Sequence, residues 1–256
     1  MELIDTHSHL YLGEFDEDRD DEVKRALANG IKRILLPNID SGSISGMMQM
    51  CQAYPGICSP MIGLHPGSVK ENYTDELKII ENWMEREEFI GIGEIGIDLY
   101  WDKTYKEQQI EAFEIQINRA KQKKIPIVIH ARESFAEIFN VLDRNMDASL
   151  TGVFHSFTGN EDQVKIINEY GFYFGINGIV TFKNSGLVDV VECIPVEKIL
   201  LETDSPYLSP VPKRGKRNES SFLIYIAERL AQIYSLTLDQ LGMITSGNAE
   251  KLFKLK

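Results

Sequence analysis

Short apolar runs alternate with longer amphipathic stretches along the whole chain. Several of the apolar runs are rich in β-branched residues and show little polar alternation, which is typical of strands buried on both faces of a parallel sheet. The runs occupy residues 3–4, 34–36, 60–64, 89–95, 125–129, 150–154, 172–176 and 199–201. Apolar residues at helical spacing occupy residues 16–29, 74–87, 106–123, 134–147, 161–170, 219–234 and 237–254.

This alternation of strand and helix across 256 residues predicts an α/β fold, a (β/α)8 TIM barrel. A doubly wound open sheet is the alternative architecture with the same alternation. No low-complexity stretch or linker interrupts the pattern, so we expect one domain over residues 1–256.

Polar residues stand at or just after the end of each apolar run. They are His7 and His9, Asn38, His65, Glu94, His130, His155, Asn177 and Asp204. In a barrel these positions gather at the carboxyl ends of the strands, where the active sites of this fold are built. The chain has five histidines, and all five belong to this set. A single buried histidine is more often a structural residue, but five at equivalent positions favour a functional site.

The spacing of these residues points to metal chemistry. His7 and His9 lie two apart on an extended segment, so both imidazoles point to the same side and can share one cation. Glycines on both sides of Glu94 leave room for a close approach to its carboxylate. Four imidazoles and the carboxylates of Glu94 and Asp204 exceed the needs of one four-coordinate ion. Two ions that share a carboxylate would use them all.

Net charge restricts how the chain can meet nucleic acid. With 27 basic and 39 acidic residues the chain carries a charge of −12, which argues against binding nucleic acid through bulk charge. A nucleic-acid substrate then requires bound cations or a local basic patch. Lys213, Arg214, Lys216 and Arg217 form such a patch after the last predicted strand, and Arg132 follows His130 by two. These cations are either a solvated loop or a binding site for an anion such as phosphate.

Composition also bears on location and assembly. The three cysteines form no CxxC pair, which predicts reduced thiols and a cytoplasmic protein. No targeting segment is expected, because the first motif already begins at Asp5. The longest uninterrupted apolar run is the five residues 125–129, far below the ~20 of a membrane span. Without a heptad seam we expect a monomer with no obligate protein partner.

The motifs taken together resemble the TatD family of metal-dependent deoxyribonucleases, which are amidohydrolase-like barrels. The resemblance covers essentially the whole chain. It rests on Asp5-Thr-His-Ser-His9, Gly63-Leu-His-Pro66, Gly91-Ile-Gly-Glu-Ile-Gly-Ile-Asp98, Ile129-His-Ala-Arg132, Phe154-His-Ser-Phe-Thr-Gly159, Leu201-Glu-Thr-Asp-Ser-Pro-Tyr207, Arg214-Gly-Lys-Arg-Asn-Glu219 and the closing Asn248-Ala.

The resemblance implies a barrel with a site for two divalent cations. The implied ligands are His7, His9 and Asp204 for one ion and His130 and His155 for the other, with Glu94 bridging both. The resemblance places His65 and Arg132 near the substrate phosphate. It also implies hydrolysis of DNA, including trimming of single strands from 3′ ends, with magnesium or manganese. Four imidazoles instead favour zinc, manganese, iron or nickel over magnesium. The working metal therefore stays open, with Mg, Mn and Zn as the main candidates.

Three functions are compatible with these residues. The first is phosphodiester hydrolysis, in which the ions activate water and Asp204 takes its proton, while His65, Arg132 and the 213–217 cluster bind phosphate. The second is hydrolysis of a small ester, lactone, amide or aminoacyl ester at the same metals, which would not need Arg214 and Arg217. The third is a metal-stabilised scaffold without catalysis, although a structural site needs only four ligands.

Overall fold

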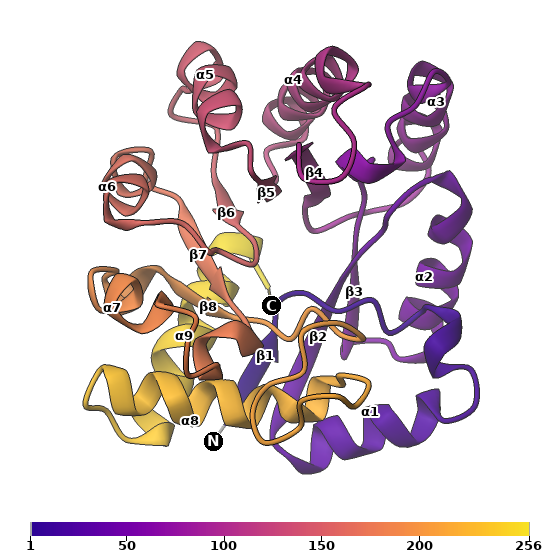
Figure 1. The fold of residues 1–256 in the computed structure, drawn as a ribbon. Coiled ribbons are helices and arrows are strands. Elements are labelled where there is room, and N and C mark those ends of the chain that lie inside the picture. The colour runs from indigo at the N-terminus through magenta and orange to yellow at the C-terminus, as the bar shows by residue number, and fades with distance from the viewer. Residues whose placement is uncertain (1, 256) are drawn as a thin grey trace.

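The computed structural model describes residues 2–255 and shows a barrel of parallel strands surrounded by helices (Figure 1). The strands are β1 (Leu3–Asp5), β2 (Ile31–Pro37), β3 (Cys58–Met61), β4 (Ile92–Asp98), β5 (Ile127–Arg132), β6 (Gly152–Phe154), β7 (Tyr173–Ile176) and β8 (Ile199–Leu201). Every predicted apolar run coincides with or overlaps one of these strands. The predicted domain also includes residues 1 and 256, which lie outside the described part of the chain.

Hydrogen bonds between neighbouring strands close the barrel. Strands β1 to β3 and strands β4 to β8 each pair in sequence order, and all pairs are parallel. At the β3–β4 seam the amide of Gly93 donates to the carbonyl of Ile62 at 2.9 Å. At the β8–β1 seam the amide of Thr6 donates to the carbonyl of Leu201 at 2.9 Å. Both edges are therefore joined, which excludes the doubly wound open sheet.

Helices pack around the strands and cover the outside of the barrel (Figure 1). They are α1 (Arg19–Ala28), α2 (Ser41–Ala53), α3 (Tyr73–Met84), α4 (Lys106–Lys123), α5 (Phe135–Asn145), α6 (Glu161–Glu169), α7 (Leu187–Glu192), α8 (Leu223–Ile233) and α9 (Leu238–Phe253). The sequence pattern did not predict α2 and α7. No helix in the described residues is long and apolar enough to cross a membrane.

The interior of the barrel is filled at one end and leaves the other end for polar groups. A layer of apolar side chains from seven strands forms one cluster, with Ala249, Leu252 and Phe253 of α9 packed against it. The members from the strands are Ile4, Leu35, Met61, Val128, Val153, Tyr173 and Leu200. Strand β4 contributes Gly93 next to this layer, where an added Cβ would lie 2.5 Å from the Cβ of Val128. This packed layer forms a floor beneath the polar residues at the carboxyl ends of the strands.

Glu22 on α1 is a buried carboxyl whose ionisation makes the free energy of unfolding depend on pH. One of its oxygens accepts a hydrogen bond from the amide of Ser220 at 2.6 Å, and the other has no partner among the described residues. Burial, with the nearby charge of Glu219, raises the pKa of Glu22 to about 7. Because this pKa lies above the value of about 4.5 in the unfolded chain, the folded state is favoured most below pH 4.5. That contribution to stability is lost as the pH rises through 7.

Glu22→Gln is therefore expected to stabilise the protein at pH 8 and to change little at pH 5. Glutamine retains an oxygen for the Ser220 amide and cannot ionise. The expected difference between the two pH values is about 2–3 kcal/mol in the free energy of unfolding, or several degrees in Tm. Thermal unfolding of both proteins at pH 5 and pH 8 measures it. Parallel pH profiles of the two proteins would contradict a buried, ionising Glu22.

Candidate metal centre

The residues predicted to form the site come together at the carboxyl ends of the strands. His7 and His9 follow β1, His65 follows β3, Glu94 lies within β4, His130 lies within β5, His155 follows β6 and Asp204 follows β8. Six separate strands therefore supply one cluster. Three overlapping groups within it have ligand atoms less than 4.8 Å apart, namely His7 with His155 and Asp204, His7 with His9 and Glu94, and His65 with Glu94 and His130.

Glu94 lies at the centre of this cluster and is almost fully buried. Its Oε2 is 3.2 Å from His7 Nε2 and 3.8 Å from His9 Nε2. Its Oε1 is 2.8 Å from His130 Nδ1 and 3.5 Å from His155 Nε2. One carboxylate thus faces two histidine pairs, one on each of its oxygens.

Asp204 stands beside the first pair, held by the seam between β8 and β1. Its amide donates to the carbonyl of His7 at 2.9 Å, and its Oδ1 lies 3.7 Å from His9 Nε2. The preceding Thr203 donates its amide and hydroxyl to the buried carboxylate of Asp5, at 2.9 and 2.6 Å. These bonds fix the backbone on which Asp204 adopts a left-handed φ of 58°. Burial, together with the charge of Glu94, raises the pKa of Asp204 to about 7.

Tyr11 determines which nitrogen of His9 carries the proton. The Tyr11 hydroxyl donates its hydrogen to the carbonyl of Pro37 at 2.7 Å. Its oxygen is 3.0 Å from His9 Nδ1 and must accept there, so Nδ1 is the protonated nitrogen. The lone pair of His9 Nε2 then faces Glu94 and Asp204. A histidine held by a hydrogen bond at its outer nitrogen is the usual arrangement of a metal ligand.

Two further carboxylates lie against the outer nitrogens of the second histidine pair. Asp98 Oδ2 lies 3.0 Å from His130 Nε2, and Glu202 Oε1 lies 3.1 Å from His155 Nδ1. The Asp98 carboxylate can only accept, so His130 Nε2 carries a proton. The contact of Glu202 with His155 is one of opposite charges, since His155 Nδ1 has no hydrogen-bond partner among the described residues. His130 Nδ1 also faces a carboxylate, Glu94 Oε1 at 2.8 Å, so a cation bound on the Glu94 side would take the place of the proton there.

His65 differs from these histidines in its hydrogen bonding. Its Nδ1 accepts the amide hydrogen of Gly67 at 2.9 Å, so the neutral ring carries its proton on Nε2. That Nε2 lies 3.6 Å from Glu94 Oε1. A protonated nitrogen has no lone pair for a metal, which makes His65 a hydrogen-bond donor at the edge of the cluster. This favours the predicted place near the substrate over a place among the ligands.

The pKa values of the two histidine pairs are shifted in opposite directions. Burial lowers the pKa of His7 well below its usual value and that of His9 to about 4. Burial acts on His130 as well, but its hydrogen bonds with Asp98 and Glu94 raise its pKa to about 9. Burial alone would raise the pKa of Glu94, yet the surrounding histidines lower it well below the usual range. Glu94 is therefore an ionised carboxylate deep in the fold.

This donor set fits a divalent cation. Imidazole nitrogens and carboxylate oxygens are the ligands that zinc, manganese and related ions take in proteins. The Nε2 atoms of His7 and His9 lie 3.3 Å apart, and the buried Nδ1 of His7 has no hydrogen-bond partner among the described residues. Two imidazole nitrogens and two carboxylates this close together in a buried site are a favourable environment for positive charge.

The predicted substrate-binding arginines have different surroundings. Arg132 is exposed and its guanidinium carbon lies 3.9 Å from the centroid of the Tyr100 ring. Arg214 lies 4.0 Å from the centroid of the Phe182 ring. Contact of these two arginines with a substrate stays a prediction.

Arg217 has a structural role that the sequence did not predict. Its two terminal nitrogens lie 2.7 and 2.8 Å from the two carboxylate oxygens of Asp18, and its guanidinium packs on the Phe15 ring. Asp18 also pairs with Arg25 of α1. These contacts join the 213–217 loop to the start of α1. They use both terminal nitrogens of Arg217 and one face of its guanidinium plane. Binding of a substrate phosphate by Arg217 would have to displace Asp18.

Sequence reasoning missed three residues of the site, which are Tyr11, Asp98 and Glu202. Each stands in or next to a motif that had been singled out, since Tyr11 follows His9 by two, Asp98 follows Glu94 by four and Glu202 precedes Asp204 by two. That proximity was the available signal. Their function depends on which ring nitrogen they meet, which spacing alone does not show.

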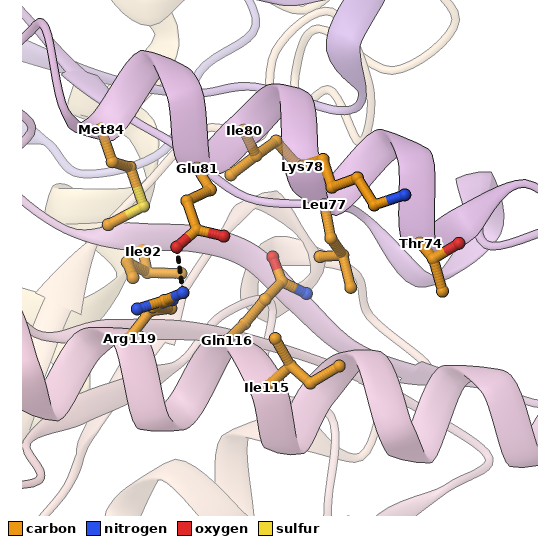
Figure 2. Close-up of a pocket in the computed structure, with 10 residues that line it drawn as sticks. All are labelled: Thr74, Leu77, Lys78, Ile80, Glu81, Met84, Ile92, Ile115, Gln116 and Arg119. Carbon is orange, nitrogen blue, oxygen red and sulfur yellow. Dashed lines mark hydrogen bonds and ion pairs between the residues drawn. The ribbon is translucent and has the colours of Figure 1, made fainter.

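A separate pocket lies between α3 and α4 (Figure 2). Its volume is about 190 Å³, and its walls combine apolar side chains such as Leu77, Ile80 and Met84 with an equal number of polar ones. Arg119 and Glu81 form an ion pair across it. None of the predicted site residues lines this pocket, so the candidate chemistry belongs to the strand ends.

Comparison with known proteins agrees with this picture. Residues 4–254 match the family described as TatD related DNase. The chain is 36% identical over 254 residues to an uncharacterised metal-dependent hydrolase, YabD, of Bacillus subtilis, covering 99% of each chain. It is 33% identical over 257 residues to the 3′-5′ ssDNA/RNA exonuclease TatD of Citrobacter rodentium, covering 98% of this chain and 97% of that one.

The fold agrees as well. The crystal structure of YJJV, a TatD homologue from Escherichia coli K12, superimposes with a TM-score of 0.93 at 25% identity, covering 99% of this chain and 98% of that one. The sequence match and the fold match each extend over nearly the full length. The chain therefore belongs to the TatD related DNase family.

Proposed function

We propose that this protein is a metal-dependent deoxyribonuclease that hydrolyses phosphodiester bonds at single-stranded 3′ ends of DNA. The observation that carries the proposal is the ionised carboxylate of Glu94, which is buried between two pairs of histidines. Support for the substrate comes from the relative in Citrobacter rodentium that is named a 3′-5′ ssDNA/RNA exonuclease. The proposal goes beyond family membership by naming the bond, the strand and the end.

The chain offers two groups of ligands for divalent cations. His7, His9 and Asp204 would hold one ion, His130 and His155 would hold the other, and Glu94 would bridge them. Such cations, when bound, supply positive charge that makes water acidic and neutralises a phosphate. Manganese or zinc suits the imidazoles better than magnesium does.

The protein's own groups have distinct tasks in hydrolysis. The Asp204 carboxylate, beside His9 at the edge of the cluster, would accept the proton that the attacking water loses. His65 presents its Nε2–H to a phosphate oxygen, because its Nδ1 is already engaged by Gly67. Arg132 adds a guanidinium on the same rim, where a planar fork matches a phosphate.

The cationic groups matter because the chain as a whole repels DNA. The net charge of −12 makes the approach of a polyanion unfavourable except where positive charge is concentrated. Bound cations at the centre and Arg132 at the rim concentrate it at the site. We therefore propose local recognition of a strand end and no wrapping of a duplex.

We also propose that the protein is a cytoplasmic monomer. Cys51, Cys58 and Cys193 are free thiols, which supports a reducing compartment such as the cytoplasm. A monomer without an obligate protein partner is proposed because every ligand in the cluster comes from this one chain.

A time course on single-stranded DNA labelled at either end tests the proposed function. Protein reloaded with manganese should shorten the 5′-labelled strand stepwise and release the 3′ label first as a mononucleotide. Shortening from the 5′ end would reject the proposed polarity. Intact DNA together with hydrolysis of an ester, lactone, amide or aminoacyl ester would move the assignment to a carbonyl substrate.

A further inference from the structure

Two large aromatic side chains are exposed at the rim of the candidate metal centre. Tyr100 and Trp101 follow β4 in the loop that leads to α4, and they are 46% and 79% exposed. A tryptophan is normally among the most buried side chains of a protein and is enriched where a protein binds a partner. Most of the Trp101 side chain is therefore left in contact with solvent.

Arg132 organises these rings into one surface. Its guanidinium carbon lies 3.9 Å from the centroid of the Tyr100 ring and 5.6 Å from that of the Trp101 ring. The two rings are 4.6 Å apart and nearly perpendicular, at 87°. We call Tyr100, Trp101 and Arg132 the aromatic platform. Contact with a guanidinium restrains the rings and keeps positive charge beside their faces.

Asp98 connects the aromatic platform to the metal centre. One of its oxygens accepts the amide hydrogen of Tyr100 at 2.9 Å, and the other lies 3.0 Å from His130 Nε2. The amide of Leu99 donates to the carbonyl of Arg132 at 3.0 Å, which continues the pairing of β4 with β5. One carboxylate therefore orients both a histidine that touches Glu94 and the loop that carries the rings. The aromatic platform is therefore joined to the site through a single side chain.

We propose that the aromatic platform is a binding site for an unpaired nucleobase, which stacks on Trp101 or Tyr100 while its strand enters the metal centre. This inference rests on the proposed nuclease function and adds a recognition element to it. Stacking on aromatic rings beside a cation is how proteins hold single strands without reading their sequence. In a duplex the bases already stack on each other, so the platform selects unpaired ends.

The surrounding charge favours a nucleic-acid strand over an apolar protein partner. Arg132 forms part of the platform, whereas Lys70, 5.3 Å from the Tyr105 ring, lies 4.0 Å from the Asp102 carboxylate, which balances its charge. Cations beside exposed rings match a ligand that presents bases and phosphates in alternation. In a chain with a net charge of −12, a cation beside the exposed rings gives a polyanion a local point of attraction.

Tryptophan fluorescence reads this contact directly. The chain has two tryptophans, and Trp83→Phe on α3 leaves Trp101 as the single reporter. Metal-loaded protein is mixed with an octathymidylate in a stopped-flow cell, so that emission is recorded before product accumulates. The matched probe is an abasic strand of equal length, which has the phosphates and no bases. We expect the octathymidylate to quench the Trp101 emission and the abasic strand to leave it unchanged. Equal quenching by both, or none by either, would overturn it.

Kinetics separate the platform from the nuclease function itself. Trp101→Ala and Tyr100→Ala should each raise KM for single-stranded DNA on the order of tenfold and leave kcat within about twofold. Trp101→Phe keeps a ring and should restore most of the affinity, and the abasic strand should be cut alike by all variants. If the unsubstituted protein cuts DNA and the alanine variants keep its KM, the platform is wrong and the function stands. If the protein cuts no nucleic acid yet thymidylate alone quenches Trp101, the nuclease proposal is wrong and the platform stands.

Discussion

Glu94→Gln is expected to lower the rate of phosphodiester hydrolysis by on the order of a thousandfold or more. Glutamine keeps the shape of the side chain, but it removes the negative charge that faces five histidines. The new amide nitrogen would also point hydrogens at one histidine pair, His7 with His9 or His130 with His155, where Glu94 oxygens now lie within 3.8 Å. Both effects weaken cation binding at the point that the two ligand groups share.

Glu22→Gln is the matched control for this substitution. Glu22 is also a buried carboxyl, but it faces Ser220 and Glu219 and contacts none of the proposed ligands. The control should keep its turnover, whereas Glu94→Gln should lose it. Turnover is measured beside metal content by elemental analysis and beside circular dichroism, which shows whether each variant is folded. A folded Glu94→Gln protein with normal metal content and normal turnover would contradict the assignment of Glu94.

Removal of divalent cations is expected to abolish hydrolysis and to lower Tm by about 5–10 °C. A cation bound only by the folded protein stabilises it by about 3 kcal/mol when present at a hundred times its Kd. Without cations, the carboxylates of Glu94 and Asp204 stay close together in a buried site, which adds to the loss. Dialysis against a chelator, followed by thermal unfolding and a rate assay, measures both effects.

Restoring the metal provides the control for chelation. Manganese or zinc should return both Tm and turnover to the unsubstituted protein and return neither to Glu94→Gln. Recovery of Tm without any hydrolysis of nucleic acid, ester, lactone or amide would favour the metal-stabilised scaffold. Full turnover in protein shown to be free of metal would contradict a metal-dependent mechanism.

The barrel could be predicted because its strands are buried on both faces. Continuous apolar runs such as 125–129 leave little doubt about a central parallel strand, and amphipathic stretches between them must cover the sheet. Two helices escaped this reasoning for physical reasons. α2 is rich in serine and glycine and depends on a capping box between Asp40 and Ser43, and α7 is only six residues long.

The inner part of the candidate site could be predicted, and its surroundings could not. Barrel topology brings strand ends together, so histidines at those ends had to meet. The partners of their outer nitrogens depend on side-chain orientation, which is why Asp98 and Glu202 were missed. The same limit applies to Arg217, because its partner Asp18 lies 199 residues away in the sequence. A basic cluster read from sequence alone shows no such pairing.

The most direct test of the metal centre is anomalous diffraction from a crystal of this protein soaked in manganese. Two peaks are expected on either side of the Glu94 carboxylate, one within coordinating distance of His7, His9 and Asp204 and the other beside His130 and His155. Peaks confined to surface carboxylates, with none within coordinating distance of Glu94, would contradict it.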